Sequence, residues 1–135
     1  MSKSLIYTAN TTGAAVPIGN TVPVGSIIRR YGPCIDATGS AINLTEAGYF
    51  DVDVSATVTA ADAGDVVLAL TQDGVPVPGA RAAATITTPT TQAENLTITA
   101  VIRVRCCGNS NIAVLVDGDT APTIENMAIR AVKVV

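Results

Sequence analysis

The chain has 135 residues, enough for one domain that buries roughly 68% of its unfolded surface without metal or disulfide staples. Charged residues make up only 14% of it and hydrophobic residues 48%, the net charge is −3, and there is no histidine. This composition excludes histidine-based catalysis and imidazole metal sites, offers no positive field to nucleic acid, and favours self-association, which would cover the surplus apolar surface.

Period-two alternation between turn residues predicts nine strands and almost no helix. Residues 1–26 are expected to form an N-terminal arm with one strand, 5–9, that lies across the domain or reaches a neighbouring molecule. Residues 27–135 are expected to form the domain itself. Its predicted strands span 27–31, 41–44, 49–59, 66–72, 81–87, 95–105, 112–117 and 124–134.

Short turns are predicted between these strands, at 36–39, 62–65, 72–79, 107–111 and 117–122. Nine or ten strands with short links fit an antiparallel β-sandwich of the jelly-roll or immunoglobulin kind. No internal repeat of 20–50 residues is visible, which disfavours a solenoid or a propeller. The fold class predicted from the pattern is therefore all-β.

Neither end of the sequence nor its interior predicts a membrane segment. The apolar run near the start, 5–7, is far shorter than the roughly 7 to 15 residues of a secretory signal. The longest purely apolar run, 66–70, is far below the roughly 20 residues that span a bilayer. We therefore expect a protein made in the cytoplasm without a signal peptide and without membrane contact.

Paired charges on two predicted strands suggest a contact between them. Asp51 and Asp53 share one face of strand 49–59, and Arg103 and Arg105 share one face of strand 95–105. Were these strands neighbours, the aspartates could pair with the arginines within a sheet or across a subunit interface. Two carboxylates that point the same way do not form the opposed pair of a glycosidase, so no catalytic residue is proposed.

Other side chains that could carry chemistry have simpler interpretations. The Asp-Gly-Asp stretch at 117–119 is typical of a β-turn, with calcium binding as the weaker alternative. Arg29 and Arg30, beside Tyr31, fit a solvated strand end or a contact with an acidic neighbouring subunit. No cofactor is expected.

The three cysteines leave alternatives open. Cys34, Cys106 and Cys107 could be free thiols, as expected in a reducing cytoplasm. A disulfide from Cys34 to Cys106 or Cys107 is the second possibility, and a metal site completed by another chain is the third.

Several stretches, taken in order, resemble a known family: LTEAGYFDVDVSATV, VVLALTQDGVPVPGA, LTITAVIRV, NIAVLVDG and MAIRAVKVV. They resemble the compact jelly roll of tumour-necrosis-factor (TNF) and complement-type globular heads, over about residues 41–135. The closer likeness is to the phage and bacterial branch, in which a strand that begins Gly-aromatic precedes a hairpin like the one at 73–79. The opening residues 3–32 are similar to the starts of short phage and prophage proteins.

The resemblance implies a homotrimer in which the Gly-aromatic strand and the last strand contact the neighbouring subunit. Carried over by position, it nominates Tyr49, Phe50, Ile129 and Val132 for that contact. It further implies a non-enzymatic virion protein, a capsid decoration or accessory subunit whose partner is the major capsid protein or another virion protein. The alternative is a head-fibre or tail-fibre tip that binds a host receptor through loops, and a cellular binding module or small hydrolase ranks last.

Overall fold

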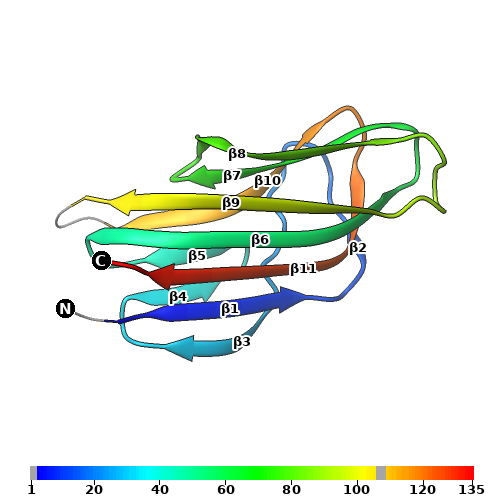
Figure 1. The fold of residues 1–135 in the computed structure, drawn as a ribbon. Coiled ribbons are helices and arrows are strands. Elements are labelled where there is room, and N and C mark those ends of the chain that lie inside the picture. Colours follow the sequence, from blue (N-terminus) through cyan, green and yellow to red (C-terminus); the bar gives the residue numbers. More distant parts are fainter. Residues whose placement is uncertain (1–2, 106–108) are drawn as a thin grey trace.

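The computed structural model describes residues 3–105 and 109–135, which form eleven strands and contain no helix (Figure 1). This part of the chain therefore also holds no helix that could cross a membrane. In chain order the strands are β1 (Leu5–Asn10), β2 (Ala14–Ala15), β3 (Ser26–Tyr31), β4 (Ile35–Thr38), β5 (Ala41–Leu44), β6 (Gly48–Ala60), β7 (Gly64–Gln72), β8 (Val75–Ile86), β9 (Glu94–Val104), β10 (Ser110–Gly118) and β11 (Pro122–Lys133).

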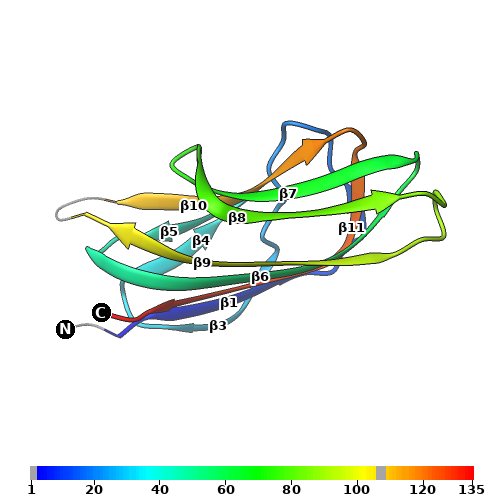
Figure 2. The same ribbon diagram turned by 45° about the horizontal axis from the view of Figure 1, so that its top comes forward.

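The strands form two antiparallel sheets that pack face to face (Figures 1 and 2). The first sheet has the order β3-β1-β11-β6-β9, and the short β2 pairs with β11. The second sheet has the order β4-β5-β10-β7-β8. The predicted all-β fold and antiparallel sandwich are confirmed.

Alternation along the strands builds the core between the sheets. In β6 the residues from Phe50 to Val58 on one parity are buried, while those on the other parity face outward. The same alternation runs through β9 and β10. Valine, isoleucine and alanine supply most of the buried side chains, because β-branched side chains pack well on a pleated surface.

The N-terminal residues are part of the sandwich. Strand β1 lies between β3 and β11, and the following segment passes from the first sheet to the second. The Val16 N–H donates to the Pro122 carbonyl (3.0 Å), and the Val22 N–H donates to the Val114 carbonyl (2.8 Å). Val16, Val22 and Val24 are buried in the core. This segment therefore crosses the sandwich of its own chain.

Three features of the strand pattern differ from the predictions. Strands β2 and β4 were not expected, and β4 occupies most of the turn predicted at 36–39. Strand β8 begins at Val75 rather than 81, so the predicted turn at 72–79 shrinks to Asp73 and Gly74, which both adopt positive φ. Proline at 76 and 78 suggested a loop, but β8 is an edge strand, where a missing backbone N–H is tolerated.

Candidate subunit interface

Large exposed apolar side chains gather on the first sheet. Most of them lie on β1, β3, β6 and β9 or at the chain end beside β6: Leu5, Tyr7, Ile27, Ile28, Tyr31, Tyr49, Val101, Val134 and Val135. In the described residues only Ile18 and Val75 lie elsewhere. All three tyrosines of the chain are in the first group. Such a concentration is typical of a region that takes part in an interaction.

We call the side of this sheet that points away from the core the outer face. One row of residues crosses all five strands of that face. Register places Tyr31 opposite Leu5, Leu5 opposite Val132, Val132 opposite Asp51, and Asp51 opposite Val101. We call this row the apolar belt; Asp51 is its only charged member.

A pocket of about 430 Å³ lies at the β3 end of the belt. Its apolar lining comes from Leu5, Tyr31, Val132 and Val134, with Lys3 among its polar lining residues. The belt therefore combines exposed apolar side chains with a hollow that side chains of another molecule could fill.

A charged pair lies one row away from the belt. Arg130 of β11 is opposite Asp53 of β6, and the Arg130 Nε donates to the Asp53 carboxylate at 3.0 Å. The Nη2 group of Arg130 contacts the same carboxylate oxygen. This hydrogen bond and the charge of Asp53 raise the pKa of Arg130 above its usual value. The two charges thus neutralise each other on the outer face.

The pairing predicted between the aspartates and the arginines is wrong within the sheet. Strands β6 and β9 are neighbours, but register places Arg103 opposite Tyr49 and Thr99 opposite Asp53. Asp53 pairs instead with Arg130 of the strand on its other side. The Arg103 guanidinium lies over the Tyr49 ring, 6.0 Å from its centroid. Arg105 is exposed just beyond the end of β9. Pairing across a subunit interface stays a prediction.

Two of the nominated contact residues are buried in the core. Phe50 is 0% exposed and Ile129 is 2% exposed, and both point between the sheets. They cannot contact a neighbouring subunit, so these two nominations are wrong. Tyr49 and Val132 do lie on the outer face, because each is on the opposite parity of its strand. The belt residues Leu5, Tyr31 and Val101 were missed, although large apolar side chains on the outward parity of their strands would have indicated them.

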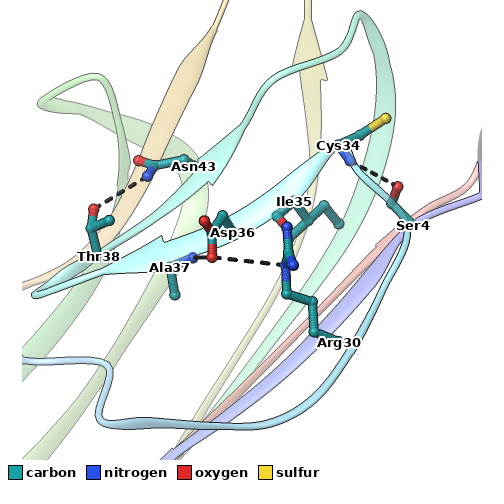
Figure 3. A network of polar contacts seen from close by, with 8 residues as sticks. All are labelled: Ser4, Arg30, Cys34, Ile35, Asp36, Ala37, Thr38 and Asn43. Carbon is teal, nitrogen blue, oxygen red and sulfur yellow. Dashed lines mark hydrogen bonds and ion pairs between the residues drawn. The ribbon is translucent and has the colours of Figure 1, made fainter.

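The described cysteine lies inside the sandwich. Cys34 is a buried free thiol whose Sγ donates to the Glu46 carboxylate, and Lys133 Nζ donates to the same carboxylate at 3.1 Å. The Cys34 N–H donates to Ser4 Oγ at 3.3 Å, and the sulfur points away from this contact (Figure 3). Cys106 and Cys107, the other two cysteines of the predicted alternatives, lie outside the described residues. No group of side chains able to hold a metal ion occurs in residues 3–105 and 109–135.

The adjacent residues Arg29 and Arg30 make different contacts. Arg30 Nε donates to the Ile35 carbonyl at 2.8 Å and lies 3.7 Å from the Asp36 carboxylate, which ties β3 to β4 (Figure 3). The Arg29 guanidinium donates to the Ile28 carbonyl at 2.9 Å. Asp117 accepts a hydrogen bond from the Gly118 N–H and faces Arg81 at 3.6 Å, but both Asp117 and Gly118 belong to β10, so the chain turns after 118 rather than from 117.

Comparison with solved structures identifies the fold. The chain is similar to murine APRIL at pH 5.0 (TM-score 0.64, 13% identity, 98% of this chain and 99% of that chain). It is also similar to the Eiger TNF of S. frugiperda (0.67, 17%, 99% and 93%) and to the globular domain of zebrafish complement 1qA (0.68, 8%, 94% and 94%). The fold is a TNF-like jelly roll. No family model and no curated protein matches the sequence.

Proposed function

We propose that the chain is a non-enzymatic structural protein that assembles as a homotrimer through the outer face of its first sheet. The apolar belt is the observation that carries this proposal. Its members lie side by side across five strands, and an exposed apolar surface of this kind is stabilised when a second copy removes it from water. The similarity to TNF and complement 1q domains supports an assembly of this type.

In a closed ring, the belt would contact two neighbouring subunits rather than one. In a closed ring of identical copies, each subunit presents two different surfaces to its two neighbours. The first sheet ends in β9 on one side and β3 on the other, and exposed apolar side chains occur at both ends. The belt can therefore meet one neighbour near β9 and the other near β3.

The biological role that fits this assembly best is that of an accessory subunit on a phage capsid, docked on the major capsid protein. The low charge, the small side chains and the absence of tryptophan suit a packed shell component better than a receptor-binding tip. Mass spectrometry of particles purified from cells that carry the gene tests the role. If the protein is absent from such particles, the virion proposal is contradicted, but the proposed trimer is not affected.

Two matched valines test the assembly. Val101 lies in the belt on β9 and is 61% exposed, whereas Val75 lies on β8 of the second sheet and is 65% exposed. Val101→Glu should convert the trimer to monomers in sedimentation velocity, because three carboxylates would be buried at the interface. Val75→Glu should leave the trimer intact. Equal behaviour of the two variants would contradict the assignment of the interface to the outer face.

A further inference from the structure

We infer that Asp51 of each copy pairs with Arg103 of the neighbouring copy, and that this ion pair fixes how the subunits align. The inference rests on the proposed trimer and adds to it the polar contact that the interface needs. It assigns the across-interface pairing to one carboxylate and one guanidinium per subunit.

Asp51 is the feature of the belt that requires an explanation. Its side chain is half-buried between Val132 and Val101, and within residues 3–105 and 109–135 it has no hydrogen bond or ion pair. A neighbouring copy that covers the belt would remove this carboxylate from water. Burial of an unpaired carboxylate strongly opposes association, so the interface must supply a cation or hydrogen-bond donors.

Two arginines that share the outer face with Asp51 already have partners within the same subunit. Arg130, the nearest one on β11, is held by Asp53, and Asp53 itself adds a second negative charge on the strand of Asp51. Arg29 on β3 donates to the backbone carbonyl of Ile28. The charge of Asp51 also raises the pKa of Arg130, but less than Asp53 does, so neither arginine neutralises Asp51 in full.

Arg103 is the arginine on β9, at the opposite end of the outer face from Arg29. It has no carboxylate partner in the part of the chain that the structure describes, and its guanidinium rests over the Tyr49 ring. It lies on β9, the strand at the end of the first sheet, so its side chain can reach beyond its own subunit. Each copy offers one Asp51 and one Arg103, which a closed ring of neighbours uses once each.

Charge reversal tests the pair. Asp51→Arg and Arg103→Asp should each raise the dissociation constant of the trimer at least about tenfold, because each variant places like charges at every interface. The double variant should recover most of the wild-type affinity. Circular dichroism of each variant verifies the fold, and Arg81→Asp, on β8 of the second sheet, serves as the control that should not change assembly.

Mixing the two single variants distinguishes a contact between copies from one within a copy. An Asp51→Arg subunit beside an Arg103→Asp subunit has opposite charges at their shared interface, although each subunit by itself carries like charges. The mixture should therefore form trimers more tightly than either variant alone. No gain on mixing would overturn the inference.

The outcomes also separate this inference from the trimer itself. A wild-type trimer that tolerates Asp51→Arg would overturn the ion pair and leave the proposed assembly in place. A wild-type monomer would overturn both.

Discussion

Because side chains alternate along β6, adjacent residues face opposite sides of the sheet. Phe50 fills the core, and Tyr49 supports the Arg103 guanidinium on the outer face. Gly48, just before them, allows the chain end to lie close by, since a Cβ there would clash with the Val135 carbonyl. The glycine–aromatic start of this strand thus reflects a close backbone approach followed by a change of side.

Thr8 offers a prediction at this scale. It is fully buried on β1, and its hydroxyl is the buried side-chain group without a hydrogen-bond partner in the described residues. Thr8→Val keeps the shape and removes the unsatisfied hydroxyl, so it should stabilise the fold by about 1–2 kcal/mol in urea unfolding.

Thr71 is the matched control for Thr8. It is also buried, but its hydroxyl donates to the Ala113 carbonyl at 3.2 Å, so Thr71→Val should destabilise the protein. A loss of stability in Thr8→Val as large as that in Thr71→Val would show that the Thr8 hydroxyl has a partner after all.

At the scale of elements, the long alternating strands could be predicted from the sequence, whereas the two edge strands of the second sheet could not. Strands β6, β9 and β11 are long and alternate clearly, and their predicted bounds differ from the observed ones by one or two residues. Strand β4 is four residues long, and β8 starts with two prolines, so local chemistry there resembles a turn. Only pairing with β5 and β7 makes these segments strands.

The end of the chain extends the first sheet beyond β11. The Val134 N–H donates to the Tyr49 carbonyl (2.8 Å), and the Tyr49 N–H donates to the Val135 carbonyl (3.1 Å). Deletion of residues 134 and 135 should therefore lower the free energy of unfolding by about 1–3 kcal/mol, measured in urea. Deletion of residue 135 alone should cost less. An unchanged unfolding midpoint in both truncations would mean that these bonds add nothing to stability.

For the whole molecule, the sequence pattern was sufficient for the sandwich, but family position did not determine which nominated residues face outward. Tyr49 and Val132 were predicted from family position and lie on the outer face, whereas Phe50 and Ile129 lie in the core. The family resemblance indicated which strands carry these residues. The side of the sheet that each residue faces follows from the alternation in this chain. The partner of Asp53 could not be predicted either, because strand order places β11 beside β6 only in three dimensions.

The central claim is that identical copies cover the outer face of the first sheet. Native mass spectrometry of the wild-type protein at micromolar concentration tests it most directly. The account predicts a single species with three times the mass of the chain, and a monomer at that concentration would contradict it.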